Sequence, residues 1–148
     1  MESFQEVDLR EAYTLIKSPA FVATKGQDVY NLTPYGWIMP MDYDPVTKVI
    51  FSSDPTHQCC QNIKRTKNFA VCIPENASDP IIEKCGSVSS PSADKFSMFN
   101  IHGEKAKKID VLIPTKIISA WLEFELIKII QEGSIELYLG QVIAAFAK

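Results

Sequence analysis

The chain has 148 residues, of which 46% are apolar and 22% charged, and its formal net charge is −3. This length fits one domain over residues 1–148, and the composition is that of an ordered globular protein. The small negative charge gives no electrostatic basis for binding nucleic acid or an anionic membrane. No stretch approaches the roughly 18 apolar residues that a membrane span requires.

The cysteines and the amino-terminal region both bear on the compartment. The first twenty residues are acidic and contain no continuous apolar stretch, so we expect no secretory signal. Cys59, Cys60, Cys72 and Cys85 show no paired spacing of the kind found in disulfide or zinc motifs. Adjacent cysteines are too strained for an ordinary disulfide. The sequence therefore predicts reduced thiols, no metal site and a cytoplasmic protein.

In chain order, the first elements are a short helix and two strands. Asp8 to Glu11 resembles a capping box, which predicts a short amphipathic helix that continues to Ile16. Residues 20–24 are typical of a buried strand that ends in the turn 25–28. Residues 31–36 are expected to form a polar loop, and residues 37–41 an edge strand.

The middle of the chain alternates strands and helices. Residues 49–53 predict a strand, and Asp54-Pro55 predicts a helix start with Asp54 as N-cap and an end near Lys67. Residues 69–73 predict the next strand, and Asp79-Pro80 the start of a second helix. Ser92 is a candidate cap for a third helix.

The last third predicts a long β-hairpin. Residues 122–126 alternate apolar and acidic side chains, as a half-buried strand does. Residues 131–134 predict the turn, and residues 135–146 the partner strand. The whole pattern favours a mainly β (α+β) fold, a barrel decorated by short helices.

Three clusters of residues could carry chemistry. The first is the loop from Asn31 to Trp37, whose hydroxyls, backbone N–H groups and aromatic rings could hold a flat heteroaromatic ligand. The simpler interpretation is a plain turn beside a core tryptophan.

The second cluster runs from Ser52 to His57, where a strand ends and a helix is expected to begin. Hydroxyls and free N–H groups at the positive end of a helix dipole suit a phosphate group. Asp54 would compete for the same donors, and the simpler interpretation is an ordinary capped helix.

The third cluster runs from Cys85 to Phe96. Its small residues would let the backbone approach a ligand closely, and Lys95 supplies a charge. The simpler interpretation is a surface loop and a helix cap. Only two histidines are present and no GxGxxG motif occurs, which argues against a serine-hydrolase triad and a Rossmann domain.

Taken in order, these clusters resemble the flavin reductase-like family, which includes the flavoredoxins. The resemblance covers nearly the whole chain, and its most specific part is Cys-Gly-x-x-Ser followed by Asp-Lys-Phe, over residues 85–96. It implies an FMN-binding split β-barrel with short helices, which forms a homodimer and holds one FMN per subunit near the interface. In similar proteins the first cluster contacts the flavin ring, the second the phosphate, and the third closes over the site.

Carried onto this chain, the resemblance assigns eleven cofactor-binding residues. Those expected on the ring side are Asn31, Thr33, Tyr35, Gly36 and Trp37; on the phosphate side, Ser52, Ser53 and His57; as further contacts, Gly86, Ser87 and Lys95. No catalytic residue is assigned. Two positions depart from the family pattern, because Cys72 replaces a common asparagine and Pro91 a common arginine.

The function that the resemblance implies is an NAD(P)H-dependent oxidoreductase. Hydride from NADH or NADPH would reach FMN, and the electrons would pass to an unidentified acceptor. The alternative is an FMN-binding electron carrier without its own nicotinamide site. A split-barrel oxidase of pyridoxine phosphate would need additional basic residues that this chain lacks, and a barrel that binds no cofactor would give a colourless protein.

Overall fold

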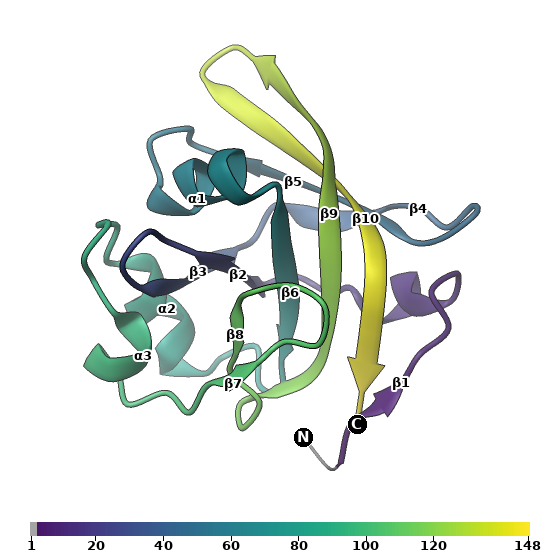
Figure 1. The fold of residues 1–148 in the computed structure, drawn as a ribbon, viewed down its shortest axis with the longest axis horizontal. Coiled ribbons are helices and arrows are strands. Elements are labelled where there is room, and N and C mark those ends of the chain that lie inside the picture. Colours follow the sequence, from purple (N-terminus) through teal and green to yellow (C-terminus); the bar gives the residue numbers. More distant parts are fainter. Residues whose placement is uncertain (1–2) are drawn as a thin grey trace.

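The computed structural model describes residues 3–148 and shows one antiparallel sheet of eight strands that curls into an incomplete barrel (Figure 1). The strands lie in the order β3 (Tyr30–Tyr35), β2 (Ala20–Lys25), β6 (Asn68–Pro74), β9 (Ile118–Glu132), β10 (Ile135–Ala147), β5 (Lys48–Ser53) and β4 (Ile38–Asp42), and β1 (Gln5–Glu6) pairs with the end of β10. β7 (Glu104–Lys105) and β8 (Leu112–Ile113) form a separate hairpin. The predicted mainly β architecture is confirmed.

The barrel is open between β3 and β4. These strands follow one another in the chain, yet they lie at opposite ends of the sheet and do not pair. Only Gly36 and Trp37 separate them. The chain therefore crosses the open seam of the barrel at these two residues.

Four helical segments cover the sheet. They are a 3-10 helix, η1 (Ala12–Leu15), and the α-helices α1 (Gln58–Thr66), α2 (Pro80–Gly86) and α3 (Lys95–Met98). α1 places Cys59, Cys60 and Ile63 in the interior of the barrel. α2 and α3 lie beside β3, at the left of Figure 1. None of the helices within residues 3–148 has the length and apolar character needed to cross a membrane.

Strand alternation produces two hydrophobic cores. On β6, Val71 faces the barrel interior and Cys72 the outer core beneath α2 and α3. On β9, Leu122 faces the barrel interior and Trp121 faces the outer core. Both faces of the central strands are thus buried, which explains why their sequences are almost continuously apolar.

The predicted hairpin is confirmed. β9 and β10 pair along their length and meet at Gly133, whose φ of 61° suits glycine in a tight turn. In Figure 1 the tip of this hairpin projects beyond the rest of the molecule. Ile135, the first residue of β10, contributes to the site described below.

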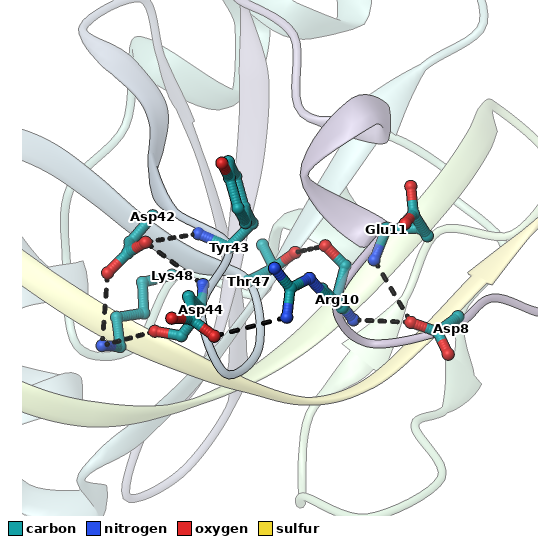
Figure 2. A network of polar contacts seen from close by, with 8 residues as sticks. All are labelled: Asp8, Arg10, Glu11, Asp42, Tyr43, Asp44, Thr47 and Lys48. Atoms are coloured by element: carbon teal, nitrogen blue, oxygen red, sulfur yellow. Dashed lines mark hydrogen bonds and ion pairs between the residues drawn. The ribbon is translucent and has the colours of Figure 1, made fainter.

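A surface network joins the amino-terminal segment to the β4–β5 turn (Figure 2). Arg10 Nη1 lies 3.3 Å from Asp44 Oδ1, and Thr47 Oγ1 donates to the Arg10 carbonyl at 3.4 Å. Lys48 pairs with Asp42 across the same turn at 3.5 Å. Such exposed pairs contribute little stability individually, but together they orient the end of edge strand β4.

Two predicted elements in the first part of the chain are wrong in detail. Asp8 accepts the N–H groups of Arg10 and Glu11, but only a single 3-10 turn follows, in place of the helix to Ile16. Residues 31–35 of the predicted loop 31–36 belong to β3, and only Gly36 lies outside the strand. Pro34 is tolerated because β3 is an edge strand, where the missing N–H removes no ladder hydrogen bond.

The predicted helix starts at Asp54 and Ser92 are also wrong. Asp54 Oδ1 accepts the N–H and the hydroxyl of Thr56, at 2.9 and 2.8 Å, and this local turn delays α1 to Gln58. Asp94, and not Ser92, caps α3 by accepting the Ser97 N–H. The cap at Asp79 is confirmed, since its side chain accepts the Ile81 N–H.

The predicted half-buried character of residues 122–126 is wrong at one position. Glu123 is fully buried although its place in the alternation predicted a solvent-facing carboxylate. It accepts the backbone N–H groups of Lys107, Lys108 and Ile109 and the indole N–H of Trp121. Four donors compensate the burial of this charge.

Candidate flavin site at the open seam

A small hollow lies at the seam of the barrel, where β3 ends and β4 begins. Its volume is about 300 Å³, and its walls come from the β3–β4 turn, the end of β5, the segment before α1 and the start of β10. The lining residues are Pro34, Tyr35, Gly36, Trp37, Ser52, Ser53, Asp54, His57 and Ile135. Six of the eleven residues assigned from the sequence therefore meet in one hollow.

Tyr35 and Ser53 close the floor of this hollow. The Tyr35 hydroxyl and Ser53 Oγ lie 2.8 Å apart, which joins β3 to β5 across the seam. Cys60 Sγ also donates to Ser53 Oγ, at 3.3 Å. Burial raises the pKa of the Tyr35 hydroxyl well above its usual range, so it stays protonated and acts as a neutral hydrogen-bonding group.

His57 supplies an unused polar atom. Its Nδ1 is buried and has no hydrogen-bond partner among the described residues. His57 is also the N-cap of α1, but its side chain makes no capping hydrogen bond. A buried nitrogen without a partner is unfavourable unless a ligand or water satisfies it, so this atom fits a hydrogen-bonding ligand in the hollow.

Trp37 stands at the mouth of the hollow. Its side chain is 76% exposed, so the interpretation of this residue as a core tryptophan is wrong. The core tryptophan is Trp121, which is fully buried. An exposed indole beside a hollow offers an aromatic surface against which a flat ring can pack.

The charge of the hollow constrains how it could hold a phosphate. Of the described residues that line it, none is a lysine or arginine, and Asp54 brings a carboxylate. Hydrogen bonds from Thr56 lower the pKa of Asp54, which keeps it ionised. A phosphate would therefore depend on the Ser52 and Ser53 hydroxyls, His57 and backbone N–H groups.

A larger hollow adjoins the small one. It has a volume of about 680 Å³, lies between the β3–β4 turn and α2, and shares Pro34, Tyr35 and Gly36 with the small hollow. Gly86 and Ser87, two further residues assigned from the sequence, line it. A Cβ atom placed on Gly36 would meet nothing within 4 Å, so this glycine leaves open space between the two hollows.

Asn31, Thr33 and Lys95 line neither hollow. They are buried together: Asn31 Nδ2 donates to Thr33 Oγ1, and Lys95 Nζ donates to the Leu32 carbonyl at 2.9 Å. The Lys95 side chain is 1% exposed, and burial lowers its pKa. Asn31 and Thr33 belong to β3 and Lys95 to α3, and the contact of Lys95 with β3 holds the two elements together away from both hollows.

The two departures from the family pattern also lie outside both hollows. Cys72 is buried in the outer core, where burial raises the pKa of its thiol. Pro91 belongs to the turn before α3. Neither residue lines the small hollow or the larger one.

Sequence reasoning did not assign Pro34 or Ile135 to the site. Pro34 was within the first cluster but lacked a polar group, and Ile135 belongs to a hairpin more than 80 residues further along the chain. Nothing local in the sequence indicates that β10 pairs with β5, with Glu136 opposite Ser53, and so brings the neighbouring Ile135 to the end of β5; only the sheet order does.

Comparison with known proteins places this arrangement in a family. A family model described as the flavin reductase like domain matches residues 13–148. No protein of curated function matches the sequence. Among solved structures, an FMN-binding domain of a flavin reductases-like enzyme from Shewanella baltica has a TM-score of 0.81 and 23% identity, over 98% of this chain and 77% of that one.

Two further solved structures show the same fold. A flavoredoxin from Methanosarcina acetivorans has a TM-score of 0.76 at 19% identity, over 88% of this chain and 68% of that one. An NADH:FAD oxidoreductase from Streptomyces globisporus has a TM-score of 0.76 at 17% identity, over 87% and 74%. The match of the family model over residues 13–148 decides the assignment: this chain belongs to the flavin reductase-like family.

Proposed function

We propose that this protein binds FMN at the open seam and acts as an NAD(P)H-dependent oxidoreductase that passes electrons to an acceptor. The observation that carries the proposal is the hollow walled by Tyr35 and Trp37 and lined by His57, whose buried Nδ1 has no hydrogen-bond partner among the described residues. Family membership and the FMN-binding and NADH-oxidising proteins named above support the same chemistry.

The bound cofactor would supply two-electron chemistry, and the chain would supply its position and surroundings. Trp37 offers an aromatic surface to the ring, while the Ser52 and Ser53 hydroxyls and His57 offer hydrogen bonds to the polar parts of the ligand. Tyr35 and Ser53 keep the floor rigid across the seam. Hydride transfer needs no protein acid or base, which agrees with the small number of titratable groups in the hollow.

We further propose that the protein works as a cytoplasmic homodimer. Met39 and Met41 are exposed on edge strand β4, whose pairing with β5 is irregular between Pro40 and Asp42. Met39 lies opposite the partly buried Ile50, and Ile50 lies opposite the buried Leu139, so the exposed methionines border an apolar surface. Exposed apolar side chains grouped on one surface favour an interface. Four unpaired cysteines suit a reducing compartment.

FMN titration of the purified protein tests the proposal. We expect FMN to bind the unaltered chain, and Gly36→Val to weaken binding at least tenfold because its side chain would project into open space at the hollow. Gly36→Val should leave the unfolding transition unchanged, since no atom is displaced. If the folded, unaltered protein binds no FMN at micromolar concentration, the proposed function is wrong.

NADH and NADPH oxidation distinguishes enzyme from carrier. The FMN-loaded protein should oxidise one of them and reduce an added acceptor. Bound FMN without any nicotinamide oxidation would favour the alternative, an FMN-binding electron carrier. Sedimentation of the unaltered chain beside Met39→Glu tests the dimer, because a charge in the centre of the apolar face should produce monomers.

A further inference from the structure

The turn between β5 and α1, where the sequence predicted the phosphate contacts, uses its own backbone donors. The Thr56 N–H donates to Asp54 Oδ1 at 2.9 Å, and the His57 N–H donates to the Asp54 carbonyl at 3.2 Å. The Gln58 N–H, the first of α1, donates to Ser89 Oγ at 3.1 Å. N–H groups at the start of a helix are the usual anion donors, and here the chain itself occupies three in succession.

The hydroxyl groups beside this turn are occupied as well. Ser53 Oγ donates to the Asp54 carbonyl at 3.1 Å and lies 2.8 Å from the Tyr35 hydroxyl. Thr56 Oγ1 donates to Asp54 Oδ1 at 2.8 Å. Because a hydroxyl has one proton to donate, a phosphate could recruit either group only by breaking one of these bonds. His57 Nδ1 remains for a ligand, and a ribityl hydroxyl suits it as well as a phosphate oxygen does.

Carboxylates supply the fixed charge of the small hollow and of the larger hollow that adjoins it. Asp54 lines the small hollow, and Asp79 and Glu83 line the larger one. None of the described residues that line either hollow is a lysine or arginine. A phosphate ester carries about −1.5 to −2 charges at pH 7, so these carboxylates repel it. The oxidised flavin ring and the ribityl chain are uncharged and avoid this repulsion.

From these observations we infer that Asp54 is a specificity-determining residue, which makes the site select a flavin by its ring and ribityl chain and not by its phosphate. Riboflavin therefore binds at least as tightly as FMN, and the phosphate of bound FMN contributes no affinity. This inference rests on the proposed function, because it concerns a flavin in the same hollow. It extends the substrate class to flavins that lack a phosphate group.

Titration of the full chain with riboflavin and with FMN, followed by the quenching of flavin fluorescence, compares the two ligands directly. At neutral pH and low ionic strength, we expect FMN to bind no more tightly than riboflavin. Added NaCl should strengthen FMN binding relative to riboflavin binding, because salt screens the repulsion between exposed charges. A cation that held the phosphate would produce the opposite trend with salt.

Asp54→Asn tests the residue itself. The amide removes the negative charge and keeps an oxygen that can accept the Thr56 N–H, so the turn before α1 should be preserved. FMN binding should become about three- to tenfold tighter, while riboflavin binding changes by less than about twofold. The matched control is Asp28→Asn, at an exposed position that lines neither hollow. It removes the same charge and should leave the ratio of the two affinities unchanged.

FMN binding more than about tenfold tighter than riboflavin binding would overturn the inference and leave the proposed function in place. An equal change of the affinity ratio in Asp54→Asn and Asp28→Asn would do the same. Binding of riboflavin without binding of FMN would support the inference and refute FMN as the cofactor. A folded chain that binds neither flavin would refute both.

Discussion

The hydroxyl of Tyr35 and Oγ of Ser53, 2.8 Å apart, join two strands that the sheet itself leaves unpaired. β3 and β5 belong to opposite ends of the sheet, and β4 lies beyond β5. This hydrogen bond therefore spans the seam of the barrel and forms the floor of the small hollow. The Tyr35–Ser53 hydrogen bond therefore both links the two ends of the sheet and shapes the candidate site.

Tyr35→Phe tests this relationship. Loss of the hydroxyl should lower the free energy of unfolding by about 1 kcal/mol and weaken FMN binding several-fold, because the floor loses its link across the seam. Urea denaturation and FMN titration measure the two effects. Tyr138→Phe is the matched control: Tyr138 is also buried in the barrel, but its hydroxyl donates to Glu136 outside the hollow. It should lose comparable stability and keep FMN affinity.

Trp37→Ala is expected to separate binding from stability. An indole that is 76% exposed contributes little to folding, so the free energy of unfolding should change by less than about 0.5 kcal/mol. FMN retention should fall, since the ring loses its aromatic neighbour. Equal retention in Trp37→Ala and in Met98→Ala, which truncates a 53%-exposed side chain on α3 outside both hollows, would contradict the ring-side assignment.

Trp121→Ala provides the contrast. Trp121 is fully buried and packs on Phe146 with ring centroids 4.5 Å apart, so its truncation should destabilise the fold by about 3–5 kcal/mol. Any loss of FMN in that variant should disappear under conditions that restore full folding.

The sequence alone predicted most strands because short apolar runs bounded by turn residues are local signals. It failed at β3, where Pro34 suggested a loop and only the edge position of the strand makes proline acceptable. It failed at Glu123, because the donors that compensate this carboxylate come from residues 107–109, which no local pattern connects to β9.

The residues of the candidate site likewise include some that a local motif predicts and others that only the folded chain brings together. Tyr35, Gly36 and Trp37 are adjacent in the chain, so one motif found them together. Lys95 was expected as a further cofactor contact, partly because of its charge, but in the fold its Nζ donates to the Leu32 carbonyl. Ile135 reaches the hollow only through the pairing of β10 with β5.

Glu123→Gln should be strongly destabilising although it preserves shape. The amide has one acceptor oxygen and an NH₂ group that would face donors, so at least two of the four N–H groups lose their partner. Each unsatisfied buried group contributes about 1–3 kcal/mol of destabilisation. Glu125→Gln, an exposed residue on the same strand, should change the free energy of unfolding by less than about 0.5 kcal/mol. Equal effects in urea denaturation would contradict the account of Glu123.

Stability should fall in alkaline solution partly because of Cys59. Burial raises the pKa of this thiol from 9.0 to about 12. Between these values the unfolded chain releases the thiol proton and the folded chain retains it. The contribution is therefore complete below pH 9 and is lost as the pH rises towards 12, by up to about 1.4 kcal/mol per pH unit.

Cys59→Ala should make this decline less steep. The small cavity that the alanine leaves lowers stability equally at every pH. The difference between the two proteins therefore has to be sought in how steeply the urea midpoint falls with pH, and not in its absolute value. Measurements between pH 8 and 11 on both proteins suffice. Parallel slopes would show that the thiol ionises alike in the folded and unfolded chains, and that burial of Cys59 beneath the seam does not hold its proton.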